Sequence, residues 1–240
     1  GDDDIQQLIH TGNDSTTAVI TATYRYTVPS DSNGGYVMSG QYTTNKFLLM
    51  EHYNTTSFDW FHRNIHTISG GANDFIRITD LLYNPSDNSF YLSGSYRGSS
   101  SSTSAILPSG SHKSYYAGEA FVSRINGTGF LTDTSYGSSP FCDWTWSSGS
   151  YSTYQGVSQP MGASTHSMIL FENRLFLTGQ FHSTFYHGGF SNTGSTHIPL
   201  ATSFGQYNLT ANNMHSGFIG GVNATSGVWD WVEKFNTSNY

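Results

Sequence analysis

The heptapeptide FYLSGSY at Phe90–Tyr96 decides how this chain folds, because two close copies of it occur elsewhere in the sequence. The copies are YVMSGQY at Tyr36–Tyr42 and LFLTGQF at Leu175–Phe181. Side chains alternate across a β-strand, so each copy places large apolar residues on both faces. We therefore expect each copy to be a strand that is covered on both sides, within a fold built from internal repeats.

The fifth residue of every copy is a glycine, at Gly40, Gly94 and Gly179. Glycine inside a strand often marks a place where another backbone comes close, so this position predicts such an approach. The alternative is that three unrelated buried strands of a β-sandwich share the pattern.

Strand and turn signals recur in the same order around each copy. A β-branched and aromatic strand precedes it, a turn rich in Asn, Asp, Ser or Gly comes between them, and two further strands follow. The sequence thus predicts an all-β fold of three tandem four-stranded antiparallel repeats, at about 18–66, 74–147 and 165–235.

The first repeat is expected to hold its strands in the order 18–28, 36–42, 47–53 and a fourth that starts at Phe58. Residues 1–17 form an N-terminal extension, in which Gln6–Thr11 is a further strand. The long insertions fall between the second and third strands of a repeat.

Two shorter patterns recur with the repeats. An Asp-Trp pair begins each fourth strand, at Asp59, Asp143 and Asp230. The turn before this strand carries Asn-x-Ser/Thr each time, at Asn54, Asn126 and Asn223. A four-stranded unit that buries both of its faces must stack on neighbours, as the blades of a β-propeller do.

The second repeat shows the pattern most fully, in Leu92–Tyr96, Gly118–Arg124, the turn Asn126-Gly127 and Trp144. In these residues the chain resembles the glycine-rich β-propeller repeats of secreted and cell-surface microbial proteins. The resemblance implies a β-propeller-like fold and a location outside the cell. Two features depart from it: the usual lysine is Arg124 here and is missing from the other repeats, and three units are present where a closed propeller needs at least four.

Three blades would leave two sheet faces and their edges exposed to water, which is unfavourable. We therefore expect neighbouring copies of the chain to complete these faces and edges. The N-terminal strand is a candidate for pairing with the edge of another copy.

Composition and charge exclude several classes of protein. Charged residues make up 10% of the chain and aromatic residues 15%, which is unlike a disordered chain. A net charge of −7 with nine Lys and Arg leaves no cationic cluster for nucleic acid. No apolar run approaches the ~18 residues of a membrane span, so we expect no membrane insertion. Few Lys among many Ser, Thr, Asn and Tyr favour an extracellular or cell-surface location.

Six Asn-x-Ser/Thr sequences are candidate N-glycosylation sites, at Asn13, Asn54, Asn126, Asn208, Asn223 and Asn236. Asn84 is excluded because Pro85 follows it. Six is near the number expected by chance, so the prediction rests on the three sites in equivalent turns. The alternative is ordinary turn formation by asparagine.

No pattern identifies a reaction, a metal site or a cofactor. The Asp-Trp pairs could supply acids beside a sugar, yet an Asp that recurs in every repeat favours a structural hydrogen bond, and a repeated Trp is expected to fill the space between units. Cys142, the single cysteine, allows no intrachain disulfide and is interpreted as a packing residue, with a redox role as the alternative. The ten His lack the short spacing of zinc ligands. Glu51 and Glu119 could form the carboxylate pair of a glycosidase.

These observations favour a non-enzymatic structural glycoprotein that binds copies of itself, as an oligomer or a filament, through the faces and edges of its sheets. One alternative is a carbohydrate-binding module whose aromatic side chains, in the loops Tyr115–Gly118 and Phe185–Phe204, stack on sugars. A glycan-active enzyme is the third hypothesis. Covalent glycans are the non-protein groups that the sequence implies.

Overall fold

The computed structural model of this chain describes its strands and several of the tight turns between them. The described residues are 4–9, 18–24, 45–53, 60–69, 75–97, 104–107, 110–113, 119–127, 142–148, 151–154, 157–160, 163–181, 184–187, 196–199, 201–210 and 216–235. Every extended regular element within them is a β-strand, so the prediction of an all-β fold is confirmed.

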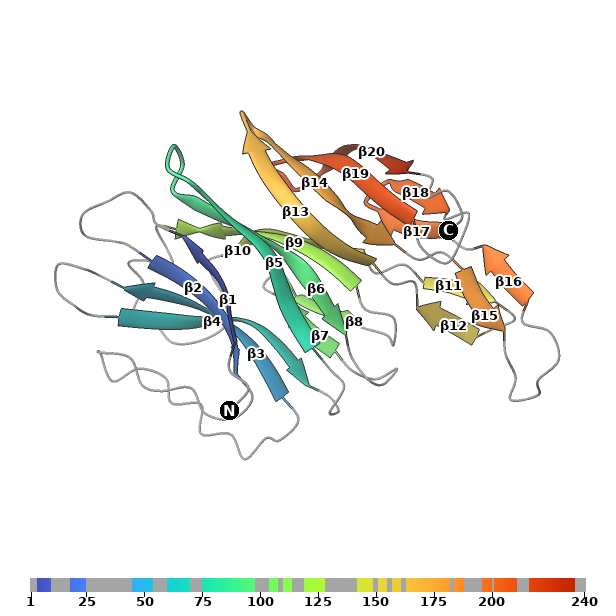
Figure 1. Cartoon of the computed structure of the whole chain (residues 1–240), viewed down its shortest axis with the longest axis horizontal. Coiled ribbons are helices and arrows are strands. Elements are labelled where there is room, and N and C mark those ends of the chain that lie inside the picture. The colour runs from blue at the N-terminus through green and yellow to red at the C-terminus, as the bar shows by residue number, and fades with distance from the viewer. Residues whose placement is uncertain are drawn as a thin grey trace.

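The first sheet holds six strands in the order β1-β2-β3-β4-β7-β8 (Figure 1). Their bounds are Asp4–Ile9 (β1), Ala18–Tyr24 (β2), Asn45–Tyr53 (β3), Trp60–Ser69 (β4), Ser104–Leu107 (β7) and Gly110–Lys113 (β8). β1 pairs antiparallel with β2 of the same chain, with Ile9 opposite Val19, and is an edge strand of this sheet. β7 pairs with β4, with Thr67 opposite Ile106, so the insertion of the second repeat extends the first sheet.

The strand order predicted for the first repeat is wrong. β2 pairs directly with β3, with Ala18 opposite Tyr53, and β3 pairs on its other side with β4. Neither side of β3 is therefore open to the strand predicted at Tyr36–Tyr42, a stretch that lies outside the described residues. The connection between β2 and β3 is long enough for the two strands to pair without an intervening strand, which local sequence signals cannot reveal.

The second and third sheets each hold four antiparallel strands, in the orders β10-β9-β6-β5 and β13-β14-β19-β20. The second contains Phe75–Asn84 (β5), Ser89–Arg97 (β6), Glu119–Asn126 (β9) and Cys142–Ser147 (β10). The third contains Ala163–Phe171 (β13), Arg174–Phe181 (β14), Ser216–Asn223 (β19) and Trp229–Phe235 (β20). The second and third repeats thus form four-stranded antiparallel sheets with the predicted order.

Three two-stranded hairpins complete the described elements. They are Tyr151–Tyr154 (β11) with Val157–Pro160 (β12), Thr184–His187 (β15) with Thr196–Pro199 (β16), and Ala201–Phe204 (β17) with Tyr207–Thr210 (β18). The last two hairpins lie in the insertion between β14 and β19. The described residues form no closed barrel or propeller, and their first sheet departs from the predicted blade.

The second and third sheets correspond strand for strand, including their irregularities. The pairing register shifts between Ile78 and Asp80 in β5 and between Thr165 and Ser167 in β13. It shifts again in the fourth strands, where one extra residue stands between partners, at Asp143 and at Asp230. Bulges place an extra residue at a fixed point of a strand and re-aim its side chain. Their equivalent positions confirm that these two sheets are copies of one unit.

The glycine of the motif stands where another backbone comes close, as predicted. A Cβ on Gly94 would lie 2.1 Å from the carbonyl oxygen of Arg77, and one on Gly179 would lie 2.2 Å from that of Ser164. The ring of Phe121 or Phe218 occupies the remaining space in each sheet. Gly40 lies outside the described residues.

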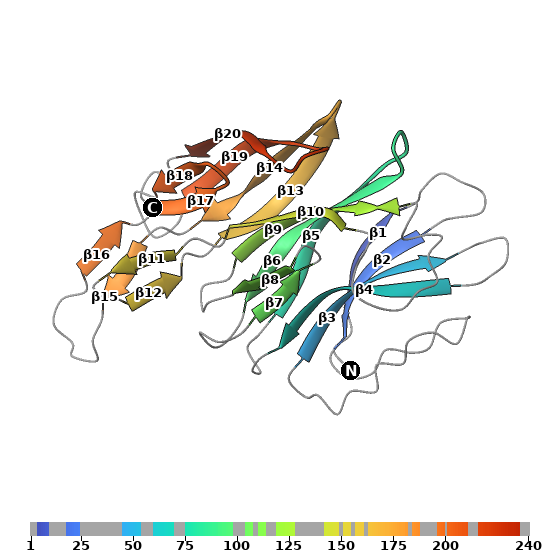
Figure 2. The same cartoon turned by 180° about the vertical axis from the view of Figure 1, so that it is seen from behind.

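One hydrophobic core lies between the second and third sheets, which are adjacent in both views (Figures 1 and 2). The second sheet contributes Tyr91 and Val122, and the third contributes an inner face of fully buried side chains that includes Leu177 and Trp229. Phe204 from β17 also enters this core, with its ring 5.3 Å from that of Trp229. Burial of these aromatic groups is the main contribution that holds the two sheets together.

Candidate assembly interface

Asp80 fixes the position of the third sheet on the second. Its Oδ2 accepts hydrogen bonds from the backbone N–H of Met168 at 2.7 Å and from Ser167 Oγ at 3.3 Å. The bulge in β5 aims this carboxylate across the gap between the sheets. Beside it, the hydroxyl groups of Thr79 and Thr165 lie 2.8 Å apart, and Thr165 also donates to the carbonyl oxygen of Gly94.

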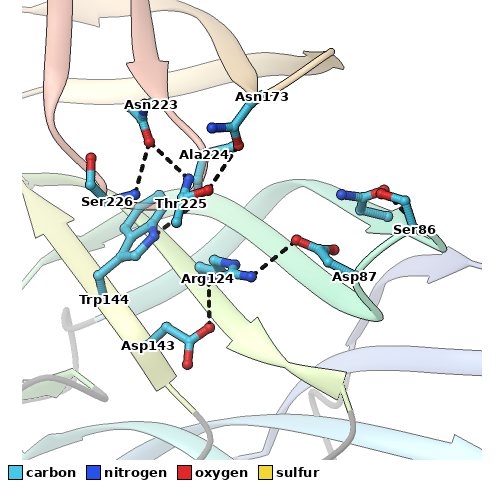
Figure 3. Close-up of polar contacts among 11 residues, drawn as sticks. Ser86, Asp87, Arg124, Asp143, Trp144, Asn173, Asn223, Ala224, Thr225 and Ser226 are labelled. Carbon is cyan, nitrogen blue, oxygen red and sulfur yellow. Dashed lines mark hydrogen bonds and ion pairs between the residues drawn. The ribbon is translucent and has the colours of Figure 1, made fainter.

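Trp144 makes the second link between these sheets (Figure 3). Its Nε1 donates to the carbonyl oxygen of Ala224 at 3.1 Å, in the turn between β19 and β20. A Cβ on Gly227 would lie 2.6 Å from the indole ring, and the positive φ of 71° at this residue also favours glycine. The ring of Tyr91 packs against the indole from within the second sheet, 6.3 Å away.

Each described Asp of the Asp-Trp pairs binds an arginine. Arg124 contacts Asp143 at 2.9 Å and Asp87 at 3.0 Å, as Figure 3 shows. Arg174 contacts Asp230 at 2.8 Å in the third sheet. Both aspartates sit at the equivalent bulge, so these ion pairs favour the structural interpretation of the repeated Asp. Asp59 lies outside the described residues.

The third sheet has an outer face that points away from the second sheet. We define this outer face by Ile169, Phe171, Phe176, Trp231 and Phe235. Ile169, Phe171 and Phe235 are each more than half exposed, at 60%, 63% and 52%. The ring of Phe176 lies 6.4 Å from that of Trp231, which repeats the contact between Tyr91 and Trp144.

The predicted glycosylation sites fall into three groups. Asn126 at the end of β9 and Asn208 in β18 are exposed. Asn223 is half-buried, and its Oδ1 accepts hydrogen bonds from the backbone N–H groups of Thr225 and Ser226, both at 3.0 Å (Figure 3). At Asn223 the structure therefore contains the turn chemistry that was the alternative interpretation. Asn13, Asn54 and Asn236 lie outside the described residues.

Glu119 is buried at the start of β9, with 4% of its surface exposed. The hydroxyl group of Tyr96 donates to its Oε2 at 2.6 Å. Burial raises the pKa of Glu119 to about 7, because a charged carboxylate is poorly solvated there. Its contacts within the described residues are those of a packed side chain. The side chain of Glu51, its proposed partner, lies outside the described part of the structure.

Cys142 is half-buried in β10, where its Sγ donates to the carbonyl oxygen of Trp144 at 3.2 Å. Burial raises the pKa of the thiol to about 11, so the reactive thiolate is scarce at neutral pH. This environment agrees with a packing residue. Phe204, at the end of one loop proposed to bind sugars, is fully buried in the core, whereas residues 115–118 lie outside the described part of the chain.

Sequence reasoning missed the residues that join the sheets most directly, Thr79, Asp80 and Thr165. A comparison of the two repeats would have marked them, because Thr79-Asp80 and His166-Ser167 hold equivalent positions but differ in chemistry. Within the described residues, no three or more His, Cys, Asp or Glu side chains gather as metal ligands. The same residues contain no helix with the length and apolar character to cross a membrane.

Comparison with known proteins gave no match: no protein-family model, curated protein or solved structure is similar to this chain. The likeness to glycine-rich propeller repeats therefore remains a prediction from the motif residues.

Proposed function

We propose that this chain is a non-enzymatic extracellular structural glycoprotein that assembles with itself, as an oligomer or a filament, through its β-sheets. One observation carries the proposal: the outer face of the third sheet is uncovered, whereas the equivalent face of the second sheet is covered by the third. The second sheet buries this face against the third sheet within the chain. The third sheet leaves its own equivalent face free to bind a partner.

The energy of covering the outer face is substantial. Burial of a Phe, Ile or Val side chain contributes roughly 1.5–3 kcal/mol relative to full exposure. Monomeric soluble proteins rarely leave a contiguous apolar patch of this kind in water, and larger patches mark interaction sites. Ile169, Phe176 and Trp231 lie in one row across the strands, with Gly221 between the two rings. Together with the exposed Phe171 and Phe235 on the same face, this row favours association.

Faces are better placed than edges to make the contact in this sheet. The edge strand β20 is already flanked by the hairpin β17–β18, because Lys234 Nζ donates to the carbonyl oxygen of Thr210 at 2.9 Å. The hydroxyl group of Tyr207 also hydrogen-bonds to the carbonyl oxygen of Asp230. The other edge strand, β13, packs against the second sheet.

Self-association is tested by sedimentation velocity on the purified chain between about 1 and 100 µM, a range that covers weak and moderate dimers. We expect the weight-average sedimentation coefficient to rise with concentration, and negative-stain electron microscopy to separate discrete oligomers from filaments. A single monomer species over the whole range would contradict the proposal. A glycan array on the same sample tests the carbohydrate-binding alternative.

A further inference from the structure

We infer that the outer face of the third sheet binds the same face of a second copy of this chain, so that two copies meet across a two-fold axis. This inference rests on the proposed self-assembly and specifies its interface. It separates a closed dimer from an open stack in which each copy binds a different surface of the next.

The outer face keeps the apolar groups of its counterpart in the second sheet. Leu82, Tyr91 and Trp144 contact the third sheet, and the residues at the equivalent positions are Ile169, Phe176 and Trp231. The replacements preserve a branched aliphatic side chain, an aromatic ring and an indole. The outer face is thus apolar enough to bind another β-sheet.

The outer face lacks the carboxylate that sets the docking register in the second sheet. Asp80, which binds the backbone of Met168, is replaced by Ser167. Arg124, which binds Asp87 and Asp143 within the second sheet, corresponds to Gly221, and Arg174 binds the equivalent Asp230 instead. A sheet docked here in the way that the third docks on the second would find no carboxylate for its exposed N–H group. Continued head-to-tail stacking on this face therefore lacks its anchor.

Two glycines of the outer face accommodate aromatic rings. Trp231 lies across Gly221, where a Cβ would come within 2.6 Å of the indole Nε1. Phe235 lies in the same way across Gly217, with its Cδ2 at 3.3 Å from an added Cβ. The two rings pack over glycines and add aromatic surface to this face, beside the side chain of Arg174.

The partner must offer an apolar surface, and the chain itself offers one. Among the described side chains, the large apolar residues that are more than half exposed are Ile169, Phe171, Val228 and Phe235. Three belong to the outer face, and Val228 lies in the turn that leads into β20. The same face of a second copy is therefore the matching surface, and such self-complementary contacts form two-fold dimers.

The size of the face predicts a weak dimer. Four strands about 4.8 Å apart and eight residues long, at about 3.3 Å per residue, cover about 500 Å² in each copy. The total of about 1,000 Å² lies at the lower limit for a specific interface. The ion pair of Arg174 and Asp230 is neutral as a unit, whereas Glu233 lies between Trp231 and Phe235 on the edge strand, where its charge weakens the contact. We expect a dissociation constant in the micromolar range.

Disulfide trapping tests the two-fold arrangement directly. Thr178 lies on β14, an inner strand of this sheet, with its side chain toward the outer face, so Thr178→Cys in a Cys142→Ser background places one thiol near the proposed axis. We expect mild oxidation to give a covalent dimer. Ser86→Cys in the same background, in an exposed turn of the second repeat, is the control that should stay monomeric.

Sedimentation velocity of Ile169→Glu gives a second readout, with Ser86→Glu as its control. A charge on the outer face should weaken the dimer at least about tenfold, which corresponds to 1.4 kcal/mol. Self-association that persists in Ile169→Glu, without cross-linking of Thr178→Cys, would overturn the interface but leave the proposed function. Association that Ile169→Glu abolishes, again without this cross-link, would point to head-to-tail contact and overturn the two-fold axis. A wild-type monomer at about 100 µM would overturn both proposals.

Discussion

Trp144 of the second sheet donates a hydrogen bond from Nε1 to the carbonyl oxygen of Ala224, which lies 80 residues later in the third sheet. The bond joins two copies of one repeat unit through the tryptophan that recurs in both. In the third sheet the equivalent Trp231 lies on the outer face. The same residue type therefore joins the two sheets in one unit and lies half-buried on an outer face in the other.

We expect Trp144→Phe to lower the free energy of unfolding by about 1 kcal/mol, because ring packing survives and one hydrogen bond is lost. Trp144→Ala should cost roughly 3 kcal/mol or more, because it also leaves a cavity between the sheets. Urea unfolding followed by circular dichroism measures both. Trp231→Phe, at low protein concentration, is the matched control and should change little. Equal effects of Trp144→Phe and Trp231→Phe would refute a role for the hydrogen bond.

The motif glycines should tolerate no side chain. Gly94→Ala and Gly179→Ala would each place a Cβ within 2.2 Å of a backbone oxygen, which the sheet cannot relieve by rotating a side chain. We expect each change to cost roughly 3 kcal/mol or more, or to prevent folding. Gly217→Ala is the control, because its nearest neighbour is the exposed ring of Phe235 at 3.3 Å, which can move. Thermal unfolding compares the three variants, and a similar loss in Gly217→Ala would contradict the argument.

The sequence was sufficient to predict the second and third sheets, because each is built from neighbouring segments of the chain. Alternation, turn residues and the glycine of the motif are local signals, and they gave the strand orders β5-β6-β9-β10 and β13-β14-β19-β20. The same reasoning did not predict the strand order of the first sheet. Its order depends on the pairing of β2 with β3 and of β4 with β7, and such pairings are decided by packing between distant segments.

The contact between the sheets could be predicted in part. A repeated Trp was expected to fill the space between units, and Trp144 does so. The role of Asp80 could not be predicted from the sequence, because it depends on a bulge in β5 that changes the direction of its side chain. The buried pair of Glu119 and Tyr96 was not predicted either, since the two residues lie 23 positions apart and the motif that ends at Tyr96 does not identify its partner.

Glycan occupancy should differ between the two sites that occupy equivalent turns. Asn126 is exposed, whereas the amide oxygen of Asn223 is engaged by Thr225 and Ser226 and its side chain is half-buried. In a eukaryotic secretory host we expect Asn126 and Asn208 to carry glycans and Asn223 to carry little. Enzymatic deglycosylation in heavy-oxygen water, followed by peptide mass spectrometry, measures occupancy at each site. Full occupancy at Asn223 would contradict this order and would also place a glycan beside the outer face.

Ionisation of Glu119 should make the protein less stable as the pH rises. Its pKa is raised from 4.5 to about 7 in the folded state, so the unfolded chain loses this proton first. The contribution of protonated Glu119 to the free energy of unfolding is fully present below pH 4.5. It is lost as the pH rises to about 7, by roughly 3 kcal/mol in total. Chemical unfolding at half-unit steps of pH measures the slope. Glu119→Gln keeps an acceptor for Tyr96 and should flatten this part of the profile.

Tyr96→Phe tests the same pair by removing the hydrogen bond instead of the charge. The phenol hydrogen bond lowers the pKa of Glu119 and thus partly offsets the effect of burial. Without that bond the carboxylate should be still less stable in the folded protein, so the loss of stability should continue to a higher pH than in the wild type. A profile for Tyr96→Phe that levels off at lower pH, or a Glu119→Gln profile with the wild-type slope, would show that another group governs the pH dependence.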